Sequence, residues 1–286
     1  MYAALLNKKL VMAVNEAQLV HQQYKKLNDD NYRCPVCQKR VILVISQLKS
    51  PFFKHISFIT GVGEKEEHLQ SKQLLCSALV ACGYPAKMEV ILAENQLRAD
   101  ILASDNLAFE IQCAPLSEVE YFHRHSLYNN LKIKDIWIVG KRHYLINKLH
   151  KSQRKYLRKS RIWDWYLLEV DPKAMMLYLK YQIQLAPNND NCYYRKKGFT
   201  IDERGLNKLF NFIPKKKNIK YSSSQVQLNY LRKQLREKTN FGRQLGEYLY
   251  RLGLTIDDLP NDVLTKNRDP FEEKRVINFC KKKTIS

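Results

Sequence analysis

Two carboxylates in a predicted β-hairpin are the side chains of this sequence best suited to chemistry. Residues 97–103 and 107–113 are alternating runs joined by a short polar connection, a pattern that predicts two antiparallel strands. Asp100 lies on the first strand and Glu110 on the second, so the two can approach each other across the hairpin. Carboxylates in apolar strands are costly unless they are paired or hold a cation. A bound Mg²⁺ would offset the repulsion between the two carboxylates, because Mg²⁺ binds one or two carboxylates and leaves its other positions to water and phosphate. Such an ion would help water to attack a phosphodiester.

Other polar side chains are spaced to join this pair. Gln112 follows Glu110 by two positions, which places both side chains on one face of the strand. Arg124 and Tyr128 are four residues apart on a helix predicted after the hairpin, and both suit a phosphate. Four more side chains lie close together on a helix predicted before the hairpin: Glu64, Glu67, His68 and Lys72. The same residues also suit a solvated helix with ion pairs and a hairpin whose acids face water.

The net charge of +21 over 286 residues is unevenly distributed. Residues 1–140 carry 16 Lys and Arg against 14 Asp and Glu, whereas residues 141–286 carry 33 against 14. The basic residues cluster with aromatic ones, which favours a nucleic-acid partner over a surface that is merely well solvated. The side chains expected to contact DNA are Arg98, Arg124, Tyr128, Arg154, Lys155, Arg158, Lys159, Lys215, Lys216 and Lys217.

The N-terminal region contains a pair of cysteines at the spacing of a zinc knuckle, Cys34 and Cys37. His55 is the best third ligand for Zn²⁺, and a structural zinc site needs four. His21 is a remote candidate for the fourth position. The alternative is a knuckle without metal, held by its apolar residues, in which both cysteines are free thiols.

Several motifs occur together in one order: EKEEHLQSK (64–72), RAD (98–100), LAFEIQCAPLS (107–117), Arg124-x-x-x-Tyr128 and DIWIVGK (135–141). With these motifs the sequence resembles the competence protein CoiA family, whose central domain belongs to the PD-(D/E)XK nuclease-like group. The resemblance covers approximately the first 190 residues. It implies a restriction-endonuclease-like α/β core. It also implies a cytoplasmic role in natural transformation, acting on incoming single-stranded DNA alongside the recombinase and promoting its processing and recombination.

One departure from the nuclease group concerns catalysis. The group's core motif ends in lysine, whereas this chain has Gln112, which carries no charge to stabilise an oxyanion. In the expected mechanism Asp100 and Glu110 bind Mg²⁺, Glu64 or Glu67 assists, and Lys72 supplies the missing cation. Gln112 then orients water or substrate, while Arg124 and Tyr128 position the strand. Two alternatives stay open: an inactive nuclease fold that binds DNA or the recombinase, and a restriction-type nuclease unrelated to competence.

The expected organisation has three parts. Residues 1–59 form the CxxC module, which is zinc-ribbon-like, and residues 60–150 form the nuclease-like domain. Residues 151–286 form a basic, mainly helical region with a strand-like interruption at 176–186. No apolar run is long enough to cross a bilayer and no export signal is apparent, so we expect a soluble, cytoplasmic protein without membrane insertion.

Overall fold

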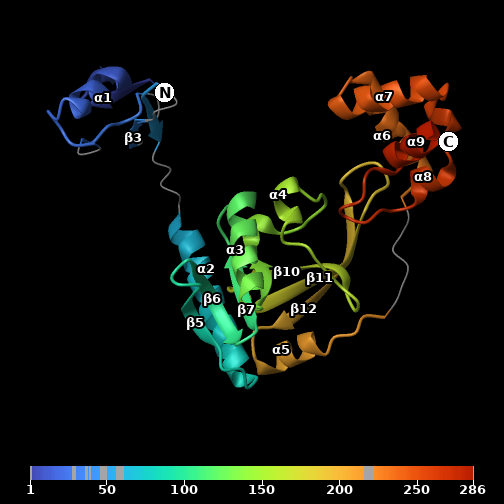
Figure 1. The fold of residues 1–286 in the computed structure, drawn as a ribbon, viewed down its shortest axis with the longest axis horizontal. Helices are drawn as coiled ribbons and strands as arrows, with labels where there is room; N and C mark the ends of the chain where they lie inside the picture. Colours follow the sequence, from blue (N-terminus) through green and yellow to red (C-terminus); the bar gives the residue numbers. More distant parts are fainter. Residues whose placement is uncertain are drawn as a thin grey trace. The chain divides into compact units, whose positions relative to one another are not determined.

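The chain folds into two units, Met1–Glu64 and Lys65–Ser286, each with its own hydrophobic core (Figure 1). The structure is a computed structural model, and it describes residues 2–27, 30–35, 38, 40–45, 50–55, 61–215 and 222–285.

The first unit contains two antiparallel strand pairs and a helix. These elements are β1 (Ala3–Leu6), β2 (Lys9–Met12), α1 (Ala13–His21), β3 (Val41–Val44) and β4 (Phe52–His55). Tyr32, Phe53 and Cys34 are buried in its core. Cys37 lies outside the described residues, as does the side chain of His55, the last residue of β4. The zinc site therefore stays a prediction.

The second unit is built on a mixed sheet. Its strands are β5 (Lys87–Leu92), β6 (Leu97–Ser104), β7 (Leu107–Gln112), β8 (Lys134–Val139), β9 (Arg158–Ser160), β10 (Asp164–Asp171), β11 (Met176–Leu185) and β12 (Cys192–Thr200). Their order is β12-β11-β10-β8-β7-β6-β5, and β9 pairs with β10. The β10-β8-β7 centre is parallel and both flanks are antiparallel.

Helices cover the sheet on both faces. On one face, α2 (Gly61–Ala81) and α5 (Glu203–Phe210) contribute Leu79 and Leu206 to a core shared with Ile101 of β6. On the other, α3 (Glu118–Asn130) packs Tyr128 against Ala99 and Ala108. Two parallel strands need a crossover between them, and α3 is the crossover from β7 to β8. The strands β6 and β7 therefore have α2 on one face of the sheet and α3 on the other, and both helices can contact their polar residues.

The hairpin predicted at 97–113 and the helices predicted before and after it are confirmed by β6, β7, α2 and α3. The mainly helical character expected for residues 151–286 is wrong for its first third. Residues 158–200 form β9–β12, which continue the sheet past the boundary expected at residue 150. β10 is buried on both faces, so its apolar side chains do not alternate with polar ones as those of a half-buried strand do. β11 does alternate, and it confirms the strand-like interruption expected at 176–186.

The C-terminal part is helical. It contains α6 (Ser224–Arg236), α7 (Asn240–Leu252), α8 (Asn261–Thr265) and α9 (Arg275–Ile285), with the short 3₁₀ helix η2 (Ile256–Asp258) before α8. Two short elements lie earlier in the unit, between β8 and β9: the 3₁₀ helix η1 (Lys141–His143) and the single-turn α4 (Lys151–Arg154). Backbone hydrogen bonds between Leu185 and Arg268 join this part to β11. Among the described helices, none combines the length and apolar character needed to span a membrane.

Candidate active site

Asp100 is placed by the hairpin, which the structure confirms. Ile101 pairs with Phe109 across β6 and β7, so Asp100 and Glu110 occupy the adjacent position of the two strands. Asp100 Oδ2 accepts a hydrogen bond of 2.9 Å from the backbone N–H of Ile111 and lies 3.1 Å from His68 Nε2 on α2. The site therefore joins two strands to the helix that precedes them.

Glu110 is almost completely buried, at 2% exposure, and is held from α3. Tyr128 donates its hydroxyl to Glu110 Oε1, and Arg124 Nη2 lies 2.5 Å from Glu110 Oε2. Arg124 also donates to the carbonyl of Arg98 at 3.1 Å. Arg124 and Tyr128, expected to position a DNA strand, thus both bind the buried carboxylate.

The two carboxylates differ in their affinity for protons. Burial, followed by the nearby negative charge of Asp100, raises the pKa of Glu110 to about 7 despite its contacts with Arg124 and Tyr128. Burial also opposes ionisation of Asp100, but the hydrogen bond and charge of His68, together with the Ile111 N–H and the charge of Lys72, outweigh it, so the pKa of Asp100 is lowered. At neutral pH the site therefore holds an ionised Asp100 beside a Glu110 that is close to its titration midpoint.

Lys72 brings a cation to the same place. Its Nζ lies 3.7 Å from Asp100 Oδ1, and the residue is buried, at 7% exposure. Lys72 also contacts the carboxylate of Glu89 on β5, which in turn pairs with Arg98 Nε at 2.9 Å. Glu89 lies between the pairs Met88–Ile101 and Val90–Ala99, so it stands beside Asp100 in the sheet.

Glu89 is the site residue that sequence reasoning missed. The available signal was a single acid among the apolar residues of 88–92, as for Asp100 in its own strand. Its backbone has φ of 55°, the left-handed region that is unfavourable for residues other than glycine. Irregular backbone of this kind re-aims a side chain, and it is common beside functional sites.

The carboxylate pair suits a divalent cation in its donor chemistry. A cation near both groups would remove the repulsion by which Asp100 raises the pKa of Glu110. Each carboxylate oxygen has two lone pairs, so contacts with Arg124, Tyr128 and His68 leave acceptor capacity. Within the described ranges, no cluster of three or more His, Cys, Asp or Glu side chains is arranged for a metal. A two-carboxylate site completed by water and phosphate fits that finding and the habits of Mg²⁺.

Gln112 and Glu67, also predicted for catalysis, contact other groups than the two carboxylates. Gln112 Nε2 donates to the carbonyl of Ala114 at 2.6 Å. Glu67 accepts a hydrogen bond of 2.9 Å from the backbone N–H of Lys141, just after β8. Glu64 belongs to α2, and its side chain is outside the described residues.

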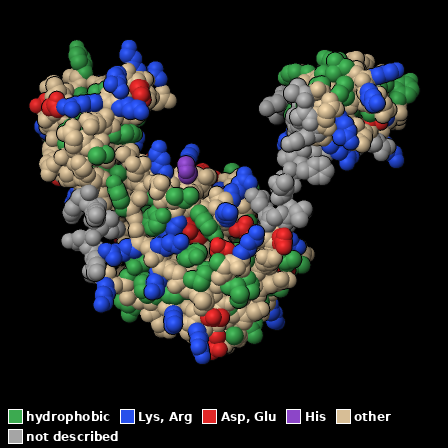
Figure 2. All heavy atoms as spheres, turned by 180° about the vertical axis from the view of Figure 1, so that it is seen from behind, with side chains coloured by type: hydrophobic (Ala, Val, Ile, Leu, Met, Phe, Trp, Pro, Cys, Tyr) green, Lys and Arg blue, Asp and Glu red, His purple; other side chains and the backbone are tan. Residues whose placement is uncertain are grey.

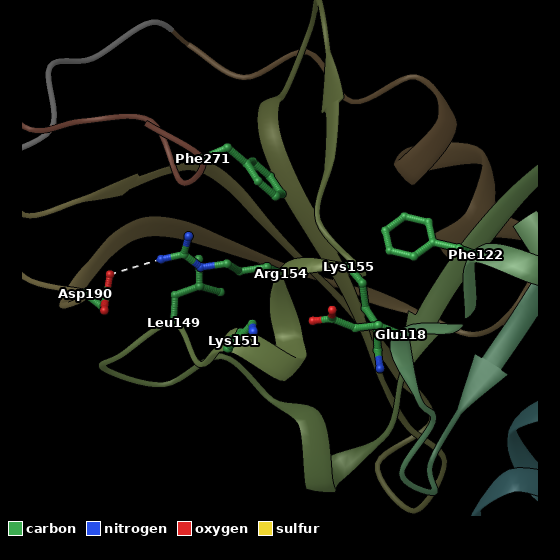
Figure 3. A pocket seen from close by; sticks show the side chains of 8 residues that line it. All are labelled: Glu118, Phe122, Leu149, Lys151, Arg154, Lys155, Asp190 and Phe271. Carbon is green, nitrogen blue, oxygen red and sulfur yellow. Dashed lines mark hydrogen bonds and ion pairs between the residues drawn. The ribbon is translucent and has the colours of Figure 1, made fainter. Parts of the chain in front are cut away.

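Four of the basic residues predicted to bind DNA, Arg154, Lys155, Arg158 and Lys159, have partners within the protein. Arg154 pairs with Asp190 at 3.1 Å, as Figure 3 shows, and Lys155 donates to the carbonyl of Leu116. Burial lowers the pKa of Lys155.

Further along the segment, Arg158 lies 3.4 Å from Asp135, and Lys159 lies 3.2 Å from Asp269. Lys215 is exposed, whereas Lys216 and Lys217 fall outside the described residues. On the face that Figure 2 shows, Lys and Arg side chains are spread among apolar ones.

Residues 64–214 match the family model described as competence protein CoiA, nuclease-like domain. The chain belongs to this family. The matched range contains every strand of the large sheet together with Asp100 and Glu110, so the family resemblance seen in the sequence is confirmed. No curated protein and no solved structure matches the chain. The α/β fold with its central mixed sheet fits a nuclease-like domain. Membership of the family indicates a role related to competence.

Proposed function

We propose that this chain acts on the single-stranded DNA taken up during competence, and that it cleaves phosphodiester bonds with Mg²⁺ at Asp100 and Glu110. The observation that supports this most strongly is the meeting of two carboxylates and Lys72 at one point of a nuclease-like sheet. On this proposal the core is of the restriction-endonuclease-like PD-(D/E)XK type.

Asp100 and Glu110 would hold the metal, which would activate water and stabilise the leaving oxygen. Glu110 has to lose its proton first, and its pKa of about 7 allows this near neutral pH. Arg124 and Tyr128 orient the carboxylate through one bond to each of its oxygens, which makes them positioning residues.

Lys72 supplies the positive charge that Gln112 lacks. Lys72 extends from α2 and contacts both Asp100 and Glu89. Glu89 lies on β5, on the opposite side of Asp100 from Glu110, so Lys72 approaches Asp100 from that side. A fixed cation beside a scissile phosphate stabilises the charge that develops on it in the transition state. His68, bonded to Asp100, keeps this carboxylate ionised and oriented.

The second candidate is a DNA-binding or recombinase-interaction factor with a nuclease fold and no turnover. The observation that favours it is that each oxygen of Glu110 already has a protein partner, and that Arg124 offsets the charge of the carboxylate without a metal. The two candidates differ in what happens when the carboxylates are replaced.

Transformation frequency in competent cells that encode this chain tests the proposal. Asp100→Asn keeps the size of the side chain and removes its charge, and we expect it to lower the frequency of recombinants about as far as deletion of the gene. Asp105→Asn is the matched control, because Asp105 is exposed in the turn between β6 and β7. Wild-type transformation by Asp100→Asn and by Glu110→Gln would favour the binding factor.

A further inference from the structure

A second feature of the nuclease-like unit is a pair of pockets along the flank of α3. The first has a volume of about 500 Å³, and Glu118 and Phe122 of α3 line it together with Lys151 and Arg154. The second, of about 420 Å³, is lined by His125 and Asn129 of α3 together with Arg158 and Lys159. Both pockets therefore lie between the same two segments, α3 and residues 151–160.

The first pocket presents aromatic rings. Phe122 is 58% exposed and Phe271 is 52% exposed, and Figure 3 shows the two rings on different sides of the pocket. Phe271 is supported from behind by Trp165, whose ring centroid is 4.7 Å away. Large exposed apolar rings beside cations suit unpaired bases, which stack on aromatic faces irrespective of sequence.

The second pocket presents positive charge. Lys132 and Lys134 are exposed at its rim, and they join Arg158 and Lys159 against a single carboxylate, Asp135.

Asp135 is buried and already satisfied. Its oxygens are 2.8 and 2.9 Å from His125 Nδ1, and one of them accepts a 2.6 Å hydrogen bond from Trp137 Nε1. Its contact with Arg158 fixes that guanidinium at the pocket. The pocket is thus prepared for an anion, and phosphate is the anion that a nucleic-acid strand provides.

We infer that α3 and residues 151–160 form one track for single-stranded DNA, with bases stacked at Phe122 and Phe271 and phosphates held by Lys132, Lys134 and Arg158. This inference rests on the proposed function, which makes DNA the partner. The 13 residues of α3 span about 20 Å, enough for several nucleotides at the roughly 3.4 Å spacing of stacked bases. α3 carries Arg124 and Tyr128 on its other flank, so the same helix takes part in the track and in the carboxylate site.

The track predicts selectivity for single strands. The bases of a duplex are stacked on each other and cannot reach Phe122, whereas the phosphates of a duplex can still reach Lys132 and Lys134. Removing the ring and removing the charges should therefore affect the two kinds of DNA differently.

Fluorescence anisotropy of the full chain with a labelled oligo-dT and with a duplex of equal length tests this, across a series of salt concentrations. We expect Phe122→Ala to weaken single-strand binding about tenfold and to leave duplex binding within twofold. The matched control is Val119→Ala, because Val119 is on the same helix and 81% exposed but does not line the pocket. Phe271→Ala should reproduce the effect of Phe122→Ala.

The charges are tested by the salt dependence. Lys132→Ala with Lys134→Ala should lower the slope of log affinity against log salt by about 1.4, at about 0.7 per phosphate contact on a single strand. Lys173→Ala, an exposed lysine between β10 and β11, should leave the slope unchanged.

The outcomes separate the track from the proposed function. Wild-type protein that binds neither DNA would overturn both. Wild-type binding by Phe122→Ala and by the double lysine variant, with Mg²⁺-dependent cleavage intact, would overturn the track alone. An equal loss on single strands and duplex in Phe122→Ala would also overturn it. A fourth outcome would overturn the track as well: Phe122→Ala weakens binding of a polyglutamate peptide but not of oligo-dT. The pocket would then bind an acidic protein segment.

Discussion

Lys72 Nζ lies 3.7 Å from Asp100 Oδ1, although one residue comes from helix α2 and the other from strand β6. The lysine that nuclease-like motifs place two residues after the second carboxylate is glutamine here, at Gln112. Lys72 therefore brings a cation to the carboxylates from a different element. The proposed catalysis depends on Lys72 taking the role that a lysine at position 112 would have.

Replacing Lys72 by methionine keeps most of its length and removes its charge. We expect Mg²⁺-dependent DNA cleavage to fall about a hundredfold, because a fixed cation near the transition-state charge contributes about that much. Gln112→Lys in the same chain should restore part of the rate, since it returns the cation to the strand. Initial rates on a labelled oligonucleotide measure both effects, and thermal melting of each variant checks folding. No rescue, together with unchanged cleavage by Lys72→Met, would remove Lys72 from the mechanism.

The pKa of Glu110 makes stability depend on pH. Folding raises this pKa to about 7, so the folded state binds more protons than the unfolded state between the usual glutamate range and pH 7. The stabilisation is complete at low pH and is lost as the pH rises through 7. Wild-type protein should lose about 2 to 3 kcal/mol of unfolding free energy between pH 5 and pH 8 that Glu110→Gln does not lose.

Urea unfolding at the two pH values measures this difference. Glu94→Gln is the control, because Glu94 is exposed between β5 and β6, and it should follow the wild type. Parallel pH dependence of Glu110→Gln and wild type would show that Glu110 titrates below this range.

Tyr128→Phe removes a hydroxyl that donates to Glu110 and leaves the ring in place. This hydrogen bond favours the ionised carboxylate, so its loss should raise the pKa of Glu110 further. Cleavage by Tyr128→Phe should therefore reach its maximum at higher pH than cleavage by wild type, with a similar maximal rate. The pH–rate profile is the readout, and a uniform loss of rate at every pH would indicate a structural role instead.

Lys180 and Glu169 form a buried ion pair 2.7 Å apart between β11 and β10. Lys180→Met leaves the carboxylate of Glu169 buried without its partner, which typically costs about 3 to 5 kcal/mol. Lys180→Met with Glu169→Met should recover part of that loss. Lys233→Met breaks the exposed pair with Glu237 and should change stability by less than about 1 kcal/mol. Denaturant titration compares all three variants, and an equal, small effect of Lys180→Met would contradict the argument.

The sequence predicted the hairpin and its carboxylates because β6 and β7 alternate and their connection is short. It did not predict Glu89, since only the pairing register of β5 with β6 brings that residue beside Asp100. It assigned Arg124 and Tyr128 to phosphate, whereas both bind Glu110, a choice that depends on how deeply β7 is buried.

Apart from the strand-like stretch at 176–186, the extension of the sheet beyond residue 150 was not predicted, for a different reason. β10 has apolar residues on both faces, and the basic residues of β12 resemble a solvated surface when read without their partners. β10 pairs with β8 and β12 pairs with β11, and composition does not reveal these pairings.

Cleavage of a labelled single-stranded oligonucleotide with increasing Mg²⁺ tests the central claim most directly. Wild-type protein and Asp105→Asn should cut it in a Mg²⁺-dependent way. Asp100→Asn should be slower by about a thousandfold, because the several kcal/mol that the metal contributes are lost. Cleavage by Asp100→Asn at the wild-type rate, or no cleavage by the folded wild-type protein at any Mg²⁺ concentration, would contradict the account.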